Sequence, residues 1–382
     1  MLGEAIGPQR RFGDNGFQTC CFEVAYILFL PVAVWFLYRF SPFNNNDGFL
    51  DPWIYFGYLH NFQDLIDRYG LPYYSVRFGL IFPLIASVKI FGPIIGYVVF
   101  VYAMYLLAGI PLYLLFRKHF SIHTAVLAYA ILVSSVWFAR TVLWTYPDAS
   151  AVPYLTAASA LIYLQPKHKR MGNSAVGFLI GLAVNSNFFS LTVAGLSGIA
   201  YLVFYRESMW EKLRNDIPWM AAGFFVVFAA GMFGHYVCCR QWNYLSTTLD
   251  ILNWSLKGSA QVYQIPFSNL LKLNSLYLLP FLVLSMLAIL KKIEFRYRSF
   301  CLSTLSYLIA VTVYFLWSRI AYQSALLEYS YYFSFLLPPC VLSAVLVSVV
   351  LAGTDSFKFR LLNLALASFL LPPLLVAHGL MK

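Results

Sequence analysis

The sequence predicts an all-α, polytopic membrane protein with about 11 transmembrane helices. Its 382 residues are 61% hydrophobic and only 11% charged, whereas soluble domains carry about 25% charged residues. Apolar runs near the length that crosses a hydrocarbon core of about 30 Å recur along the whole chain. Because no stretch between them is long enough for a separate soluble domain, residues 1–382 are predicted to form a single integral membrane domain.

The apolar runs place the transmembrane helices along the chain. The predicted spans are residues 22–40, 93–116, 120–139, 149–164, 174–187, 188–205, 217–238, 274–290, 299–317, 329–351 and 361–378. The run 174–205 is too long for one span. Asn185, Ser186 and Asn187 at its middle predict a tight turn between two short helices, and a single kinked helix is the alternative.

The distribution of basic residues predicts the orientation of the chain. With the N-terminus in the cytoplasm, 16 of the 26 Lys and Arg residues fall on inner segments, as the positive-inside rule requires. The net charge of +11 therefore reflects membrane topology and not a nucleic-acid partner. The predicted location is the bacterial plasma membrane, with outer segments facing the periplasm or exterior, and the endoplasmic reticulum is the alternative.

The first outer segment, residues 41–92, is predicted to begin with an amphipathic helix. Within "DPWIYFGYLHNFQDLIDRYG", apolar residues recur at helical spacing while His60, Asp64, Asp67 and Arg68 point elsewhere. The predicted apolar face consists of Tyr55, Leu59, Phe62, Ile66 and Tyr69. Such a helix is typical of the membrane interface.

The rest of this segment, residues 76–91, is apolar but interrupted by Arg77, Pro83 and Lys89. It is predicted to be interfacial or re-entrant. The alternative, a full span, would invert every later segment and move the basic clusters outside.

Ionisable residues are nearly absent from the spans and gather on the predicted outer side. Proton- or ion-coupled transporters place such residues near the bilayer midplane. Here the ionisable residues within the spans all lie near a span end, and they are Glu23, Arg39, His123, His235 and His378. The outer acids are Asp47, Asp51, Asp64, Asp67, Asp148, Asp250 and Glu328, and Arg77, Arg140 and Arg319 share that side. This arrangement suits a reaction between a lipid-borne phosphate in the bilayer and a polar acceptor outside it.

Four stretches carry a resemblance to a known family. The motifs "NNDGFLDPWIYFGYLHNFQDL", "YYSVRFGLIFP", "WTYPDA" and "EYSYYFSFLLP" resemble the GT-C membrane glycosyltransferases. The resemblance implies a polyprenyl-phosphate-linked sugar donor, acidic residues in the first outer loop, and a glycan or glycolipid acceptor.

The chemistry of such a transfer needs a single base. A polyprenyl phosphate is already a good leaving group, so one carboxylate can deprotonate the acceptor hydroxyl for direct displacement with inversion. The catalytic candidates are Asp47 and Asp51. Asp51 precedes Pro52, a pair typical of a helix start, whereas Asp47 has no such structural role, and we therefore favour Asp47.

Arginine and carboxylate side chains supply the predicted binding groups. Arg77, Arg319 and Arg140 are predicted to bind the donor phosphate, because a guanidinium fork contacts phosphate at two places. The resemblance implies sugar- or acceptor-binding roles for Asp148, Tyr146, Glu328, Tyr329, Tyr331 and His60. No spacing demands a metal, although several outer carboxylates offer the oxygen ligands that Mg²⁺ or Mn²⁺ prefers.

The predicted function is transfer of a sugar from a polyprenyl-phosphate donor to a surface glycan or a lipid-linked precursor on the outer face. A transporter or flippase of lipid-linked saccharide is the alternative from another class, but it would need a continuous polar path across the membrane. A non-catalytic membrane subunit is the third interpretation, in which Asp47 would be dispensable.

Overall fold

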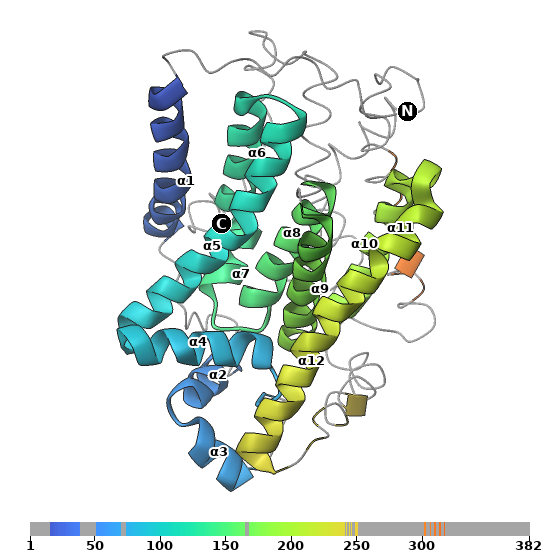
Figure 1. Cartoon of the computed structure of the whole chain (residues 1–382). Coiled ribbons are helices and arrows are strands. Elements are labelled where there is room, and N and C mark those ends of the chain that lie inside the picture. The colour runs from blue at the N-terminus through green and yellow to red at the C-terminus, as the bar shows by residue number, and fades with distance from the viewer. Residues whose placement is uncertain are drawn as a thin grey trace.

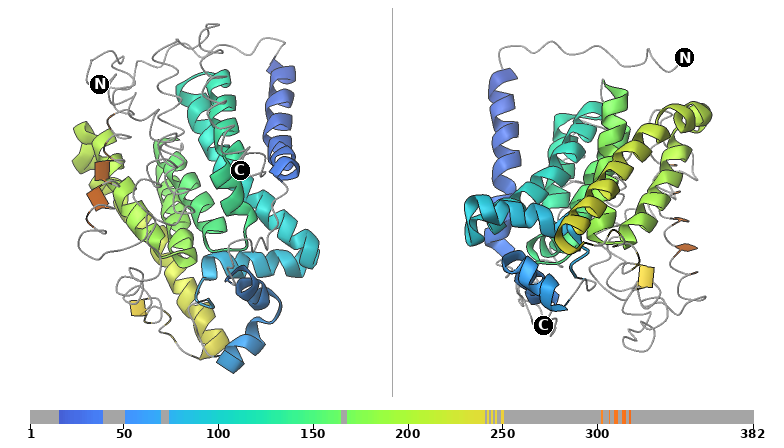
Figure 2. Two further views of the ribbon diagram at one scale, coloured as in Figure 1. Left: turned by 180° about the vertical axis from the view of Figure 1, so that it is seen from behind. Right: turned by 60° about the horizontal axis from the view of Figure 1, so that its bottom comes forward.

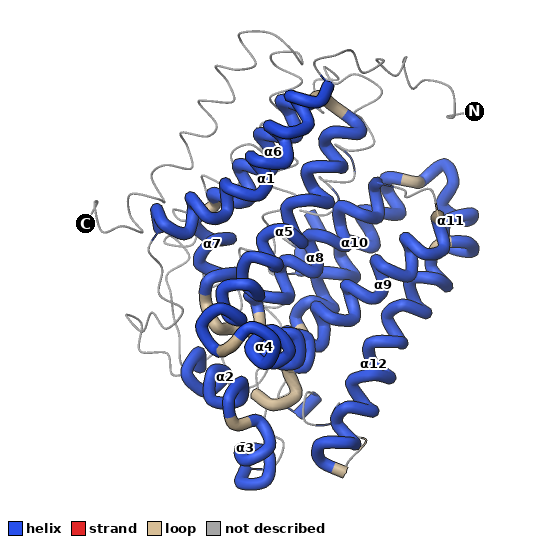
Figure 3. Tube along the Cα trace, turned by 60° about the vertical axis from the view of Figure 1, so that its left-hand side comes forward, coloured by secondary structure: helices blue, strands red, loops and turns tan. Residues whose placement is uncertain are grey.

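The computed structural model describes residues 16–38, 51–69, 74–164 and 168–240, with isolated positions beyond them. Every regular element in this part of the chain is a helix (Figure 3). The helices are α1 Gly16–Tyr38, α2 Asp51–His60, α3 Phe62–Tyr69, α4 Phe78–Phe91, α5 Pro93–His119, α6 Ile122–Ser134, α7 Val136–Leu143, α8 Asp148–Leu164, α9 Lys169–Ser186, α10 Phe189–Phe204, α11 Met209–Asn215 and α12 Ile217–Cys239, with a short 3₁₀ turn at Arg206–Ser208.

The long helices form a bundle in which α5 packs on α8, α8 on α9, and α9 on α12. Figure 1 shows α4 lying across one end of this bundle, where α2 and α3 also lie. We call it the α4 end; it is the end that the sequence predicts to face outward. In both views of Figure 2, α1 stands at one edge of the bundle and α11 at the opposite edge.

Helices occupy the positions of the spans predicted before residue 240, but only some of them are long and apolar enough to cross a membrane. By length and composition, α5 and α12 are each able to cross a membrane, and α10 with α11 would be a third span bent by 86°. Shorter apolar helices cover 21–37, 78–91 and 122–134. The predicted spans 274–290, 299–317, 329–351 and 361–378 lie outside the described residues, apart from isolated helical positions between 302 and 317.

Two local predictions have clear outcomes. The turn predicted at 185–187 is confirmed, because α9 ends at Ser186 and α10 begins at Phe189. The single span predicted over 120–139 is wrong, because the helix breaks at Ser135, whose backbone is extended (φ −60°, ψ 125°). Serine hydroxyls compete for backbone hydrogen bonds, and the Ser134 hydroxyl donates to the carbonyl of Ala130 at 2.6 Å.

Within residues 76–91, Phe78–Phe91 form α4, a helix of 14 residues. At 1.5 Å per residue it is about 21 Å long, which is short of a hydrocarbon core of about 30 Å. Its length supports the interfacial or re-entrant prediction over a full span. The corner into α5 is made by Gly92, whose φ of 84° favours glycine, and by Pro93 at the first helical position.

The amphipathic segment after residue 51 is two helices and not one. A bend at Asn61 separates α2 from α3, as suits a residue that prefers helix ends. Of the predicted apolar face, Tyr55, Leu59 and Ile66 are buried and Phe62 is half-buried, but Tyr69 is 60% exposed. The buried face packs on protein: α2 contacts α4, and the Phe62 and Phe82 rings lie 5.8 Å apart.

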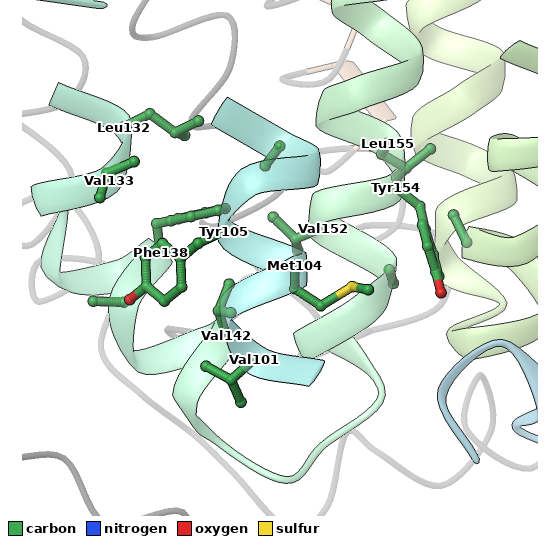
Figure 4. Close-up of a cluster of buried hydrophobic side chains, with 14 of the residues drawn as sticks. Val101, Met104, Tyr105, Leu132, Val133, Phe138, Val142, Val152, Tyr154 and Leu155 are labelled. Carbon is green, nitrogen blue, oxygen red and sulfur yellow. The ribbon is translucent and has the colours of Figure 1, made fainter. Parts of the chain in front are cut away.

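The core between α5, α7 and α8 is rich in aromatic and aliphatic side chains. Figure 4 shows Tyr105 and Phe138 facing one another, with ring centroids 5.4 Å apart and an edge-to-face geometry. The same view shows Met104 beside Val152. Within a bilayer such close packing, more than burial from water, holds helices together.

The α9–α12 contact depends on small residues. A Cβ atom added at Gly177 would overlap the carbonyl of Met220, and one added at Gly223 would overlap the carbonyl of Ser174. The two backbones therefore approach as closely as glycine allows, a packing mode common between membrane helices.

Gly177→Ala is therefore expected to destabilise the protein by about 1–3 kcal/mol, because the added methyl forces the two helices apart. The midpoint of thermal unfolding in detergent measures the effect. The control is Gly198→Ala on α10, where an added Cβ meets nothing within 4 Å. An equal response of the two variants would contradict the proposed close contact.

Candidate functional site

A group of polar side chains is buried together at the α4 end. Asp148 stands at the start of α8, Arg77 immediately precedes α4, and Asn187 lies in the turn between α9 and α10. Their exposed fractions are 1%, 5% and 8%. We define the polar cluster as Arg77, Asp148, Ser150, Asn185, Ser186 and Asn187.

Asp148 is the acid of this cluster. Its Oδ1 atom accepts a hydrogen bond from the side-chain amide of Asn187. Its Oδ2 atom is buried and has no hydrogen-bond partner among the described residues. Asp148 precedes the predicted span 149–164, and burial raises its pKa to about 7, while the Asn187 hydrogen bond and the positive charge of Arg77 lower it.

Arg77 is held at the start of α4. Its backbone carbonyl accepts hydrogen bonds from the N–H groups of Leu80 and Ile81, both at 3.0 Å. The sequence places this guanidinium at the edge of an apolar segment, where snorkelling toward lipid is the simple expectation. The structure instead buries it in protein, where its charge acts on Asp148.

A second layer of hydrogen bonds supports the turn that carries Asn187. The side-chain amide of Asn185 donates to the carbonyl of Gly181 at 2.9 Å, and its Oδ1 accepts from the Tyr244 hydroxyl at 2.7 Å. The Ser150 hydroxyl donates to that of Ser186 at 2.9 Å and joins α8 to α9. These bonds fix the α9–α10 turn against the start of α8.

Aromatic side chains connect this site to the first outer segment. The rings of Trp144 and Tyr146 stack with centroids 4.9 Å apart in the "WTYP" loop before α8. Tyr146 also meets Tyr55 of α2 edge to face at 5.9 Å, and Tyr55 meets Tyr74 at 5.3 Å. Through Tyr146, the loop that leads to Asp148 contacts α2.

Two predicted site residues are not part of the polar cluster. The Arg140 guanidinium lies 6.0 Å from the ring of Trp144. His60 is exposed, and its ring packs 4.5 Å from that of Phe56. His60 is therefore a surface residue and not one of the buried polar groups.

The remaining predicted site residues cannot be placed. Asp51 begins α2, as expected for an Asp-Pro pair, but its side chain lies outside the described part. Outside it as well are Asp47, Arg319, Glu328, Tyr329 and Tyr331. In the described ranges no three His, Cys, Asp or Glu side chains come together as a metal site.

The sequence predicted only a turn at Asn187 and did not predict its hydrogen bond to Asp148. The available signal was an uncharged polar pair, Asn185 and Asn187, in the middle of an apolar run. A polar side chain at such a position needs a hydrogen-bond partner. The identity of that partner, Asp148, follows only from the fold.

An apolar pocket of about 550 Å³ lies mainly between α8 and α10, with smaller contributions from α5, α9 and the first turns of α12. No residue of the polar cluster lines it. At its nearer end Val152 and Leu191 stand four residues, about one helical turn, after Asp148 and Asn187. From there the lining continues along α8 and α10, away from the polar cluster, to Tyr163 and Leu202.

A comparison with known proteins bears on the class of the chain. Residues 80–233 match the sequence model of a family described as dolichyl-phosphate-mannose-protein mannosyltransferase. Over this part the chain is similar to GT-C-type membrane glycosyltransferases. Its donor is a sugar carried on a polyprenyl phosphate, so the predicted enzyme class is confirmed.

The match to this family of glycosyltransferases spans 154 of the 382 residues. It contains Asp148 and Asn187, while Arg77 precedes it by three positions. No curated protein and no solved structure matches the chain. The similarity supports an integral membrane transferase and does not identify the acceptor or the roles of single residues.

Proposed function

We propose that this glycosyltransferase moves a sugar from a polyprenyl-phosphate donor to a surface glycan or a lipid-linked precursor at the α4 end. The observation that carries the proposal is the buried pair of Arg77 and Asp148 at the α4 end. A donor of this class has a charged phosphate, a polyhydroxylated sugar and an apolar chain. The pair offers a cation and a carboxylate, and the bundle offers an apolar cavity that starts one helical turn from Asp148.

The phosphate is assigned to Arg77. A guanidinium buried at 5% exposure is desolvated, so its hydrogen bonds to an anion are stronger than they would be in water. As the glycosidic bond breaks, negative charge grows on the phosphate, and a fixed cation stabilises that charge. Arg140 and Arg319 are the further phosphate-binding candidates.

The sugar or acceptor is assigned to the carboxylate side of the site. The open Oδ2 atom of Asp148 is suited to accept a hydrogen bond from a hydroxyl of the sugar or the acceptor. Tyr146 flanks this position through its contact with Tyr55. The other candidates from the sequence are Glu328, Tyr329, Tyr331 and His60. Of these, His60 is exposed.

The polyprenyl chain is assigned to the apolar pocket. Its volume of about 550 Å³ lies within the range of about 300–1,000 Å³ that is usual for ligand pockets. A chain lying between α8 and α10 would end about one helical turn from Asp148, so that its head group would lie at the α4 end.

The reaction is proposed to be a single displacement with inversion, with Asp47 as the base and Asp51 as the alternative. The chain is further proposed to form one domain of about 11 spans in the bacterial plasma membrane. Its α4 end would face the periplasm or exterior, as the distribution of basic residues indicates.

The test is transfer of label from a panel of radiolabelled polyprenyl-phosphate sugars to host glycan by the purified wild-type protein. Mannose, the sugar in the family description, is the first member of the panel. Label in the glycan, with the anomeric configuration opposite to that of the donor, is expected. Retention of configuration would overturn the single displacement. Movement of the lipid-linked sugar across liposomes without transfer would overturn the proposed reaction.

A further inference from the structure

The two oxygens of the Asp148 carboxyl have different environments. Oδ1 accepts a hydrogen bond from Asn187, whereas Oδ2 is buried without a partner among the described residues. Leaving a buried polar atom unsatisfied is costly, and natural proteins tolerate few such atoms. A hydroxyl of a bound ligand would satisfy Oδ2.

The amide of Asn187 can face Asp148 in only one way. Its Oδ1 accepts the backbone N–H of Phe189, at the start of α10, at 3.1 Å. The Nδ2 group is therefore the one directed at Asp148, where it can donate but not accept. The backbone N–H of Asn187 is bonded to the carbonyl of Ala183 at 2.8 Å, so the whole residue is fixed between α9 and α10.

We propose that Asn187 is a positioning residue, which holds Oδ1 of Asp148 so that Oδ2 is presented to a hydroxyl of the sugar or the acceptor. This inference rests on the proposed function. Asn187 itself does not touch the reacting atoms; it acts through the carboxylate. A hydrogen-bond donor at the position of the Asn187 amide also favours the ionised carboxylate. In that form both carboxylate oxygens can accept hydrogen bonds.

The charges around Asp148 set the expected pH dependence. The titratable or charged side chains on the surrounding elements are Arg77 before α4, Tyr97 on α5, Arg140 on α7, Tyr146 and Tyr154 along its own chain, and His235 and Tyr244 beyond Asn185. Of these, Arg77 is the charge that acts on Asp148. Since Asp148 has a pKa of about 7, the ionised form is gained as the pH rises through 7, and transfer is expected to rise with it.

The experiment compares transfer by the wild type, Asn187→Leu and Asn187→Asp between pH 5 and 9. Asn187→Leu removes the hydrogen-bond donor to Asp148, so we expect the transfer rate at pH 7 to fall by about 10- to 100-fold. The acid limb of its pH–rate profile is expected to move to higher pH, because the hydrogen bond that lowered the Asp148 pKa is gone.

Asn187→Asp is expected to behave in the opposite sense. At high pH two adjacent carboxylates repel each other and transfer is lost. At lower pH the pair shares one proton, which restores a donor to Asp148 and part of the activity. A merely structural role for Asn187 predicts no such reversal.

Asn185→Leu is the matched control. It removes the same residue type two positions away, with 6% exposure against 8%, but Asn185 bonds to Tyr244 and Gly181 and not to Asp148. Because Asn185 supports the turn, its loss is expected to lower the rate at every pH. The acid limb of the pH profile is expected to stay at the wild-type position, since Asn185 makes no hydrogen bond to Asp148. Equal profiles for the wild type and Asn187→Leu, or an equal shift in Asn185→Leu, would overturn the proposal.

An infrared titration separates this proposal from the proposed function. The difference in the carboxyl band between the wild type and Asp148→Asn reports the Asp148 pKa without any turnover. Asn187→Leu is expected to raise that pKa whether or not a sugar is transferred. Absence of transfer by the wild type would overturn the proposed function, whereas an unchanged band in Asn187→Leu would overturn the role of Asn187.

Discussion

Asp47→Asn is expected to lower the rate of sugar transfer by about 10²- to 10⁴-fold, the usual contribution of general-base assistance. The amide has nearly the same shape as the carboxylate but cannot take a proton from the acceptor hydroxyl. Binding of the donor lipid is expected to remain, since the base acts on the acceptor. Single-turnover transfer from labelled donor, together with a donor-binding assay, measures both quantities.

Variants of two further acids of the first outer segment, Asp64 and Asp51, serve as comparisons for Asp47→Asn. Asp64 is exposed on α3, so Asp64→Asn is expected to transfer like the wild type. Asp51→Asn distinguishes the two candidate bases. A large loss in Asp51→Asn with a small one in Asp47→Asn would exchange their roles, and full activity in both would exclude a base in this segment.

Arg77→Gln is expected to reduce transfer by about 10²- to 10³-fold, the effect typical of removing one fixed group that stabilises developing negative charge. The guanidinium is buried next to Asp148, so water cannot replace it at the phosphate. Part of the loss is expected to appear as weaker donor binding. Equilibrium binding of labelled polyprenyl phosphate, measured beside transfer, checks the assignment.

The Arg77 experiment needs a control for folding, because removal of one buried charge leaves Asp148 without its counter-charge. The double variant Arg77→Gln, Asp148→Asn removes both charges and is expected to recover thermal stability without recovering donor binding. Arg77→Lys keeps the charge but not the fork, and intermediate binding is expected. Arg68→Gln, an exposed arginine on α3, should leave binding unchanged; if it weakens binding equally, the phosphate is held by the general surface charge.

The helices could be predicted from the sequence because apolar length is a local property. The turn at Asn185–Asn187 follows from polar residues in an apolar run, and the start of α2 follows from Asp51 and Pro52. The breaks at Asn61 and Ser135 were missed, because in each case a single residue decides against an otherwise continuous pattern. A bend at one residue leaves almost no trace in a periodicity read over a whole helix.

The site could be predicted only in part. The residue types and the predicted membrane face drew attention to Arg77 and Asp148, and the structure brings these two together. Asn187 is 39 positions from Asp148, and no periodicity reports a contact of that range. His60 was selected for its chemistry in an amphipathic segment, but it lies on the exposed side of α2.

The position of α4 divides the first outer segment into two parts with different attachments. Gly79 of α4 lies so close to α9 that an added Cβ would overlap the carbonyl of Leu182 and the hydroxyl of Ser186. Arg77, two residues earlier, therefore moves with the bundle, although by sequence it belongs to the same segment as α2 and α3. If Arg77 binds the donor phosphate as proposed, substitutions on the exposed faces of α2 and α3 are therefore expected to leave that contact in place.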